Sequence, residues 1–145
     1  MTHGCATKRA EEPVIYLDTS AMVKLVTAEP ESGELIRWLN GHSDEVLATS
    51  AIGHIELIRA ARRLGAAATA AAQRVASMTD TLVLTDTIAT AATTIGAAEL
   101  RTLDAIHLAT ADLHRSRLSA FCVYDHRLLA AARVAQLPTV TPGIT

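Results

Sequence analysis

Aromatic side chains are scarce in this sequence. Phe, Trp and Tyr make up 3% of the 145 residues, although half of all residues are hydrophobic. That hydrophobic content predicts a folded, globular chain rather than a disordered one. Because so few aromatics are available, the core must be packed mainly by alanine and by Leu, Val and Ile, which favours closely packed helices.

Cysteine and long apolar runs are scarce as well. The two cysteines are Cys5, in the N-terminal tail, and Cys122, in an apolar run, so a structural disulfide is not expected and a reducing compartment fits. No apolar run is as long as a membrane span. Residues 1–13 contain no hydrophobic segment of the signal-peptide type, and we expect a cytoplasmic protein.

Neither sign of charge dominates. The formal net charge is −2 and the pI is near 6.3, so bulk electrostatics give no support for a nucleic-acid partner, although a local basic groove is compatible with them. Glycine-rich phosphate-binding loops are absent. The sequence also lacks a Cys pair and any histidine spacing that would suit zinc.

The length of the chain fits one domain with one substantial core. Residues 1–13 are polar and unpatterned, so we expect a disordered tail there and a single domain over residues 14–143. Short apolar runs predict strands at Val14–Leu17, Thr81–Thr85 and Ala120–Tyr124, with weaker candidates at Val46–Thr49 and Thr139–Val140. Helical patterns lie at Ser20–Thr27, Pro30–Asn40, Ser50–Leu64, Ala66–Met78, Thr87–Gly96, Leu103–Arg115 and His126–Ala135. Alternating strands and helices predict an α/β fold, a three-layer α/β/α sandwich with a central, mostly parallel sheet.

Four acidic residues occupy positions where partial burial is expected. Asp18 and Asp125 each follow an apolar strand, Glu56 lies beside the apolar stripe of its helix, and Asp104 opens another helix. In an open parallel sheet the ligand site lies beyond the carboxyl ends of the strands. If the two strands are neighbours, Asp18 and Asp125 emerge on the same edge.

Each acid also has a purely structural explanation. Asp104 and Asp125 could be first-turn acids favoured by the helix dipole, and Asp18 could form an Asx turn. Glu56 could pair with a neighbouring arginine. The four together weaken this explanation, because crowded carboxylates repel one another unless a positive group neutralises them.

The four carboxylates predict a site for a hard divalent cation. Oxygen ligands in this number favour Mg²⁺ or Mn²⁺. One or two such ions would orient a water and neutralise a phosphate in transit, so the predicted chemistry is hydrolysis of a phosphodiester or phosphomonoester. His54 and His107 lie near the proposed site, and we expect them to pack or to support it rather than to bind the ion.

Four ordered motifs carry a resemblance to a known family. They are "YLDTSAMVKL", "TSAIGHIELIRA", "LRTLDAIHLATA" and "VYDHRLLAAA". Together they resemble the successive motifs of PIN-domain ribonucleases, and most of all those of the VapC toxins of bacterial VapBC toxin–antitoxin pairs. The similarity covers essentially all of residues 14–143, and four motifs with their acids in register are far more specific than a lone Asp-x-Ser.

The resemblance implies roles for individual residues. Asp18, Glu56, Asp104 and Asp125 match the acidic quartet that binds Mg²⁺ or Mn²⁺, and Ser20 matches a hydroxyl position that supports the site. The family it resembles cleaves single-stranded regions of structured RNA, often tRNA or rRNA. The resemblance also implies a homodimer and a toxin–antitoxin hetero-oligomer with a cognate VapB-type antitoxin.

Two features of the proposed site need structural information. Val123 stands where PIN domains often have Ser or Thr, which puts the support of Asp125 in question. Arg59, one turn after Glu56, is the favoured candidate for contact with RNA phosphate. Other basic candidates are Lys24, Arg62, Arg63 and Arg101. The scarcity of aromatics argues against base stacking as a main source of RNA affinity.

Three alternative functions fit parts of the pattern. A catalytically weak PIN fold that only binds RNA or an antitoxin would explain Val123. A phosphatase of the haloacid-dehalogenase type would need a second acid where Ser20 stands, and a response-regulator receiver would need adjacent acids that the sequence lacks. The predicted function is therefore a metal-dependent endoribonuclease that acts as a toxin.

Overall fold

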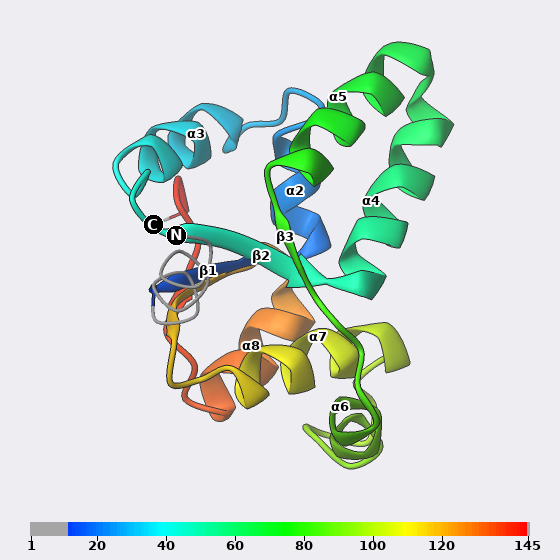
Figure 1. The fold of residues 1–145 in the computed structure, drawn as a ribbon, viewed down its shortest axis with the longest axis vertical. Helices are drawn as coiled ribbons and strands as arrows, with labels where there is room; N and C mark the ends of the chain where they lie inside the picture. Colours follow the sequence, from blue (N-terminus) through cyan, green and yellow to red (C-terminus); the bar gives the residue numbers. More distant parts are fainter. Residues whose placement is uncertain (1–11, 145) are drawn as a thin grey trace, which may run out of the picture.

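The computed structural model describes residues 12–144, and its centre is a five-stranded sheet (Figure 1). The strands are β1 (Val14–Leu17), β2 (Val46–Ser50), β3 (Asp80–Leu82), β4 (Leu118–Cys122) and β5 (Thr139–Val140). They lie in the order β3-β2-β1-β4-β5, and every neighbouring pair is parallel. β1 and β4 are therefore adjacent at the middle of the sheet, which places the residues that follow them on one edge.

Helices cover both faces of the sheet. They are α2 (Thr19–Lys24), α3 (Ser32–Asn40), α4 (Ala51–Leu64), α5 (Ala66–Ser77), α6 (Asp86–Ala92), α7 (Thr102–Leu113) and α8 (His126–Val134). Figure 1 shows α2 to α5 on one side of the sheet, and α7 and α8 on the other, with α6 beside α7. The predicted three-layer α/β/α arrangement is confirmed.

The alternation of side chains along β1 divides the core in two. Ile15 and Leu17 pack with α2 to α5 on one face, whereas Tyr16 packs with α7 and α8 on the other. Successive strand residues point to opposite faces. Because both faces are covered by helices, every residue of β1 is buried, which explains why the strand reads as an unbroken apolar run rather than an alternating one.

Two strands end earlier than predicted. β3 covers Asp80–Leu82 rather than residues 81–85, because Thr85 already caps α6 by accepting a hydrogen bond from the Ile88 amide at 3.2 Å. β4 ends at Cys122, so Val123 and Tyr124 separate the strand from Asp125. Val123 stays fully buried all the same, which is why a hydrophobicity pattern extends the strand too far.

α4 and α5 form a helical hairpin. Gly65 joins the two helices with a φ of +116°, a conformation that L side chains rarely adopt. Leu57 and Ala61 of α4 share a buried cluster with Ala72 and Val75 of α5. Small alanine side chains let the helices approach closely, as the composition predicts.

The predicted tail lies largely outside the described residues. Of residues 1–13, the structure describes only Glu12 and Pro13, and the Pro13 carbonyl accepts a hydrogen bond from the Val46 amide at 3.0 Å. Cys122 is buried with a free thiol, and Cys5 falls in the undescribed part. Among residues 12–144, no helix has both the length and the apolar character needed to cross a membrane.

Candidate active site

The four predicted acids line a single cavity beyond the carboxyl ends of the central strands. Its volume is about 330 Å³. The lining residues are Asp18, Thr19, Ser20, Glu56, Arg101, Thr102, Leu103, Asp104 and Asp125. They come from the junction of β1 and α2, from α4, from the N-terminal end of α7, and from the residue that caps α8. The fold thus brings together side chains that are up to 107 positions apart in the sequence.

Asp18 is fixed where β1 gives way to α2. Its amide donates to the Cys122 carbonyl at 3.0 Å, and its side chain caps α2 by accepting from the Ser20 amide at 3.2 Å. The Ser20 hydroxyl donates to the same carboxylate oxygen, Oδ2. Burial raises the pKa of Asp18, although His107 and the bonds from Ser20 oppose the rise. The acid is therefore rigid and only 4% exposed.

Ser20 connects the two strand-end acids. While its Oγ donates to Asp18, the same oxygen accepts from the Tyr124 amide at 2.9 Å and from the Asp125 amide at 3.3 Å. One hydroxyl thus ties the first turn of α2 to the loop that leads into α8. This is the supporting position that the resemblance assigns to Ser20, and the structure shows the contacts available for such a role.

Asp125 has support that does not involve residue 123. Its Oδ1 accepts from the Leu128 amide at 2.9 Å and so caps α8, and its own amide donates to Ser20. Val123 points into the apolar cluster that contains Tyr16 and Leu128. A hydroxyl at position 123 would be buried in that cluster, and here Ser20 and the helix cap hold the acid instead.

Asp104 is the acid whose ionised form is most clearly destabilised by neighbouring acids. It lies in the first turn of α7 and is partly buried. Burial raises the pKa of its carboxyl, and the charges of Asp125 and Asp18 raise it further, while His107 and Arg101 act in the opposite sense. Excess negative charge in a confined space is what a bound cation would relieve.

Glu56 is held by two neighbours. Its Oε1 accepts from the Thr19 hydroxyl at 2.7 Å, and the same oxygen lies 2.7 Å from Nε2 of His107. Burial alone would raise the pKa of Glu56, but the bonds from His107 and Thr19 outweigh it and the pKa is lowered. Glu56 therefore stays ionised beside the cavity.

His107 is a buried connector, as expected of a supporting rather than a ligating histidine. Its Nδ1 lies 2.6 Å from the Tyr16 hydroxyl, and its Nε2 lies 3.3 Å from Thr19 Oγ1 and 3.7 Å from Asp18 Oδ1. Burial lowers the pKa of His107, but the bond with Glu56 and the nearby acidic charges outweigh it and raise the pKa. The other histidine considered, His54, bonds to Thr81 Oγ1 at 2.9 Å through Nδ1.

Thr19 and Tyr16 are contributors that the sequence motifs did not single out. Thr19 is next to Asp18, and Tyr16 stands two residues before Asp18 within the predicted strand. A signal did exist for His107, since it follows Asp104 by three residues and shares a helix face with it. Nothing in the sequence alone places Tyr16 against that face.

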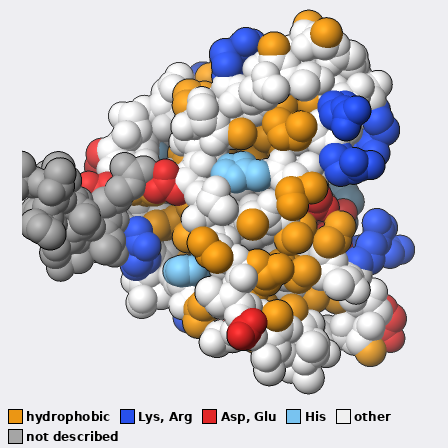
Figure 2. Space-filling model, turned by 45° about the vertical axis from the view of Figure 1, so that its right-hand side comes forward, with side chains coloured by type: hydrophobic (Ala, Val, Ile, Leu, Met, Phe, Trp, Pro, Cys, Tyr) orange, Lys and Arg blue, Asp and Glu red, His pale blue; other side chains and the backbone are white. Residues whose placement is uncertain are grey.

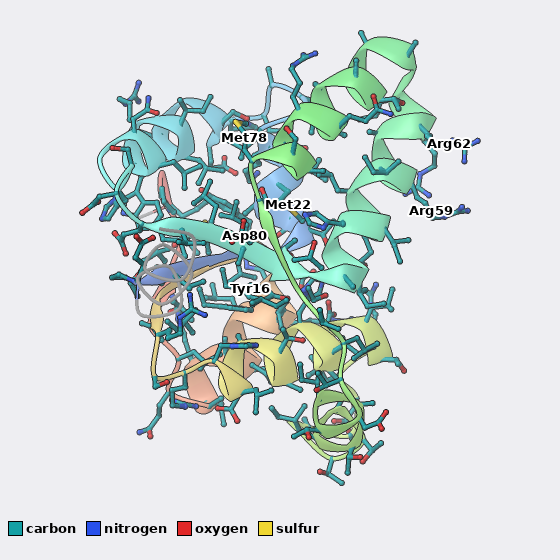
Figure 3. All side chains as sticks on the ribbon, viewed as in Figure 1. Tyr16, Met22, Arg59, Arg62, Met78 and Asp80 are labelled. Atoms are coloured by element: carbon teal, nitrogen blue, oxygen red, sulfur yellow. The ribbon has the colours of Figure 1, made fainter. Side chains whose placement is uncertain are left out.

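The basic candidates divide sharply by location. Arg101 lines the acidic cavity, whereas Arg59 is exposed on α4 and lies outside the cavity lining. Figure 3 shows Arg59 and Arg62 reaching away from α4 into solvent. Lys24 is buried against Glu29 and Glu31 at 3.0 and 2.9 Å. In the space-filling view, Lys or Arg side chains stand above and below a small acidic patch at one edge of the molecule (Figure 2).

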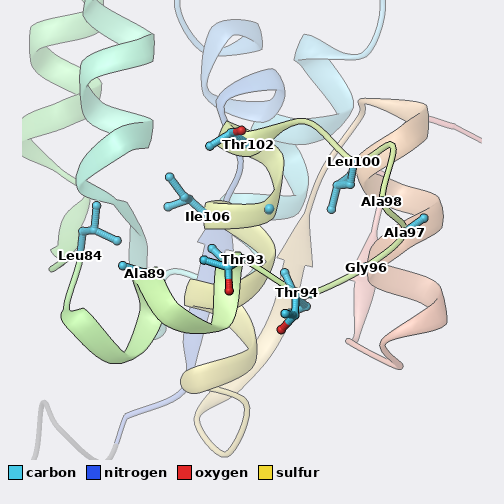
Figure 4. Close-up of a pocket in the computed structure, with 13 residues that line it drawn as sticks. Leu84, Ala89, Thr93, Thr94, Gly96, Ala97, Ala98, Leu100, Thr102 and Ile106 are labelled. Carbon is cyan, nitrogen blue, oxygen red and sulfur yellow. The ribbon is translucent and has the colours of Figure 1, made fainter.

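A second, larger cavity adjoins the acidic one. Its volume is about 630 Å³, and it lies between α6, α7 and the loop that joins them (Figure 4). Thr102 lines both cavities, but the larger one is lined by alanine, leucine, isoleucine, glycine and threonine, without a titratable side chain. Of these two adjoining cavities, only the smaller one offers titratable side chains for acid–base or metal chemistry.

The donor set of the smaller cavity suits a hard divalent cation. Its charged oxygens are all carboxylates, which is the chemistry that Mg²⁺ and Mn²⁺ prefer. As the side chains stand, no three His, Cys, Asp or Glu residues within 12–144 form a ready-made metal site, and Glu56 is turned toward Thr19 and His107. The residues therefore fit the ion by the type of their ligand atoms.

Comparison with known families identifies the class to which this fold and cavity belong. Residues 15–134 match the PIN domain family, and the chain belongs to it. Ribonuclease VapC47 of Mycobacterium tuberculosis (strain CDC 1551 / Oshkosh) is 45% identical over 133 residues, which are 90% of this chain and 98% of that protein. Ribonuclease VapC46 of M. tuberculosis (strain ATCC 25618 / H37Rv) is 39% identical over 129 residues, 89% of this chain and 98% of that protein. Within the PIN domains, the chain belongs to the VapC ribonucleases, as the motifs predict.

Solved structures agree on the fold. M. tuberculosis VapC20, described as a sarcin-ricin loop cleaving toxin, superposes with a TM-score of 0.63 at 24% identity, over 81% of this chain and 94% of that one. A chain from a toxin–antitoxin complex of Klebsiella pneumoniae gives a TM-score of 0.65 at 22% identity, over 88% of this chain and 97% of that one. At identities of 24% and 22%, these two structures show that the fold is similar, and the comparison goes no further than the fold.

Proposed function

We propose that this VapC ribonuclease is the toxin of a toxin–antitoxin pair and that it hydrolyses phosphodiester bonds in structured RNA with Mg²⁺ or Mn²⁺. The proposed ion ligands are Asp18, Glu56, Asp104 and Asp125. The observation that carries the proposal is that these four carboxylates line one small cavity, where burial and the neighbouring acids raise the pKa of Asp104. The membership in the VapC ribonucleases supports RNA as the substrate.

Each residue has a task that follows from its contacts. Asp18 offers a rigid carboxylate, because the bond of its amide to β4, its cap of α2 and the Ser20 hydroxyl all fix it. Asp125 faces it from the start of α8, and Asp104 and Glu56 complete the set from α7 and α4. A divalent cation bound there supplies Lewis-acid stabilisation of the charge that develops on a phosphate in transit. In the proposed reaction water attacks phosphorus and the 3′-oxygen leaves, so no side chain needs to form a covalent intermediate.

The substrate side of the proposal rests on arginine. Arg101 lines the cavity and is exposed, so its guanidinium can reach a phosphate next to the scissile bond. Arg59 stays a prediction as a phosphate contact, and its exposed position on α4 fits a nucleotide farther along the strand. Contacts of this kind bind RNA without reading its sequence.

The partners of the chain are also proposals. A chain of similar fold has been solved in a toxin–antitoxin complex, and we expect a VapB-type antitoxin to bind this chain and block cleavage. We expect a homodimer as well, within a toxin–antitoxin hetero-oligomer. The proposed place of action is the cytoplasm, where cellular RNA is found.

RNA cleavage is the direct test of the proposed activity. Purified protein is incubated with total RNA in Mg²⁺, in Mn²⁺ and in EDTA, alongside the Asp18→Asn variant. We expect cleavage with either ion, none in EDTA, and a loss of at least about 100-fold in the variant, because a neutral amide is a poorer ligand for a hard cation. Undiminished cleavage in EDTA or by the variant would sink the scheme, and RNA binding without cleavage by wild type would favour a binding module.

Growth assays separate a toxin from a housekeeping nuclease. Induction of the wild-type chain should arrest growth, and co-expression of a cognate VapB-type antitoxin should relieve the arrest. The Asp18→Asn variant should be tolerated at an equal protein level. Sequencing of the new RNA ends after induction then names the target, and harmless expression of an enzyme that cuts RNA in vitro would contradict the toxin assignment.

A further inference from the structure

The two hydrogen bonds of Glu56 reach the same oxygen. Thr19 Oγ1 and His107 Nε2 both lie 2.7 Å from Oε1, whereas Oε2 has no hydrogen-bond partner within the described residues. The carboxylate is half-buried at the wall of the acidic cavity. Its Oε1 is thus occupied by protein donors, and its Oε2 is the oxygen left for another ligand.

The His107 ring is itself fixed from the core. The Tyr16 hydroxyl lies 2.6 Å from Nδ1, and the two rings meet edge to face with centroids 5.8 Å apart. Tyr16 in turn stacks on Phe121, with centroids 5.1 Å apart. All three residues are at most 1% exposed, so a continuous buried chain of contacts runs from the centre of the sheet to Glu56.

The backbone is shaped to accept this chain of contacts. α4 passes so near to the His107 ring that a Cβ at Gly53 would lie 3.2 Å from Cε1, and it would lie 2.2 Å from Thr49 Oγ1. Only glycine permits that approach without displacement. Because Glu56 follows Gly53 by nearly one turn of the same helix, the close approach brings its carboxylate within reach of Nε2.

Hydrogen-bond chemistry gives the chain of contacts a direction. A carboxylate only accepts, so Nε2 of His107 donates to Glu56. In the neutral ring Nδ1 is then an acceptor, and the Tyr16 hydroxyl donates to it. The Tyr16 hydroxyl keeps its proton for this purpose, since burial raises its pKa far above neutrality.

We propose that His107, oriented by Tyr16, is a positioning residue that holds Glu56 by Oε1 and thereby presents Oε2 to the divalent cation. The inference rests on the proposed function, because it assigns Glu56 to the ion. It goes further by making Glu56 a ligand through one oxygen only, with a buried Tyr–His pair setting its angle. Supporting groups of this kind orient ligands, and their removal costs metal affinity although they never touch the ion.

Direct measurement of Mn²⁺ binding tests this role separately from catalysis. Binding to the full chain is followed by electron paramagnetic resonance for wild type, His107→Ala, His107→Gln and Tyr16→Phe. We expect His107→Ala to weaken binding by about 10-fold or more, and Tyr16→Phe by about fivefold, the equivalent of one lost hydrogen bond. Glutamine can place an amide N–H near the position of Nε2, so His107→Gln should recover most of the affinity.

His54→Ala is the matched control. His54 lies on α4, two residues before Glu56, and bonds to Thr81 Oγ1 rather than to the cavity. The His54→Ala variant should bind Mn²⁺ as tightly as wild type does. In cleavage assays over a range of RNA concentrations, His107→Ala should lower kcat at limiting Mn²⁺, regain it at high Mn²⁺, and leave KM for RNA unchanged, a pattern that a merely weakened fold does not give.

The outcomes are distinct. If wild type neither binds Mn²⁺ nor cuts RNA, the proposed function fails. If wild type does both, and folded His107→Ala and Tyr16→Phe bind Mn²⁺ as tightly as wild type, the positioning role alone is overturned. Should His107→Ala not fold, Tyr16→Phe decides, because it keeps the ring that stacks on Phe121 and removes only the hydroxyl.

Discussion

Asp18 and Asp125 follow adjacent parallel strands, and each caps the helix that comes next. Asp18 accepts from the Ser20 amide in the first turn of α2, and Asp125 accepts from the Leu128 amide in the first turn of α8. The two acids therefore combine a structural task with their place in the cavity. Suitable substitutions separate the two tasks.

Substitution of Asp125 separates helix capping from charge. Asp125→Asn keeps an oxygen that can accept from the Leu128 amide, whereas Asp125→Ala removes the cap. We expect the alanine variant to lose about 1 kcal/mol of unfolding free energy and the asparagine variant to lose much less. Both should lose RNA cleavage, because neither supplies a charged oxygen to the cavity. Chemical denaturation and a cleavage assay provide the two readouts.

The contrary result is equally clear. If Asp125→Asn cleaves RNA as wild type does, Asp125 is only a helix cap, and the site works with the other three acids. That outcome would agree with the sequence, in which Val123 stands where PIN domains often have a Ser or Thr that supports the last acid.

Removal of the Ser20 hydroxyl should affect both stability and activity. In Ser20→Ala the Tyr124 amide loses its acceptor, and Asp18 loses a donor. An unsatisfied buried polar group costs about 1–3 kcal/mol, so the unfolding free energy should fall by that order. Cleavage should fall as well, because Asp18 and the loop before α8 are no longer joined. Ser119→Ala is the control, since that hydroxyl donates to the Val14 carbonyl at 3.1 Å from an exposed position away from the cavity. An equal loss in both variants would contradict a special role for Ser20.

Much of the fold follows from the sequence because the signals are local. The β1 run is apolar throughout since both faces are covered, and α4 ends at Gly65 because that position needs a positive φ. The predicted end of β3 is too late because Thr85 already caps α6, and that of β4 is too late because Val123 is buried without being in the strand. Hydrophobicity reports burial, and here it does not distinguish a strand from the turn that follows it.

In the site, too, the residues that could be predicted are those with a local sequence signal. The acids could be chosen because a carboxylate at a strand end or within an apolar stripe is costly, and that cost is visible in the sequence. The roles of Tyr16 and Thr19 could not be predicted from the sequence, because their contacts with His107 join positions 91 and 88 residues apart. The spacing to Glu56 favours Arg59 over Arg101, whereas in the structure Arg101, at the N-cap of α7, lines the cavity.

Neutralisation of Asp104 should stabilise the protein when no metal is present. Burial and the charges of Asp125 and Asp18 raise the pKa of Asp104, so its ionised form destabilises the fold at neutral pH. Asp104→Asn removes that repulsion and should raise the Tm in EDTA, by about 2–4 °C for each kcal/mol gained. Excess Mg²⁺ should raise the Tm of wild type more than that of the variant, because only an intact site binds the ion tightly.

Asp112→Asn is the matched control for Asp104. Asp112 lies on the same helix, but it is exposed and pairs with Arg115 at 2.6 Å. Exposed pairs contribute about 0–1 kcal/mol, so this variant should be equally or slightly less stable than wild type, with or without Mg²⁺. A Tm in EDTA that is lower for Asp104→Asn than for wild type would contradict crowding of the acids.

The metal-free protein should lose stability as pH rises above about 6.5. Burial lowers the pKa of His107, but its bond with Glu56 and the charges of Asp18, Glu56 and Asp104 outweigh burial and raise the folded-state pKa above the ordinary 6.5. The stabilisation is therefore complete below 6.5 and is lost as pH passes through the folded-state value.

The acids do not reverse that slope. The pKa values of Asp18 and Asp104 are also raised, so these acids likewise reduce the stability of the fold as pH rises. The pKa of Glu56 is lowered, so Glu56 gives its full contribution to stability at any pH above about 4.5. Thermal unfolding in EDTA between pH 6 and pH 8.5 should show a falling Tm for wild type and a flatter profile for His107→Gln, which cannot titrate. A wild-type Tm that rises over this range, or an equal slope in the variant, would show that the His107–Glu56 pair does not govern stability here.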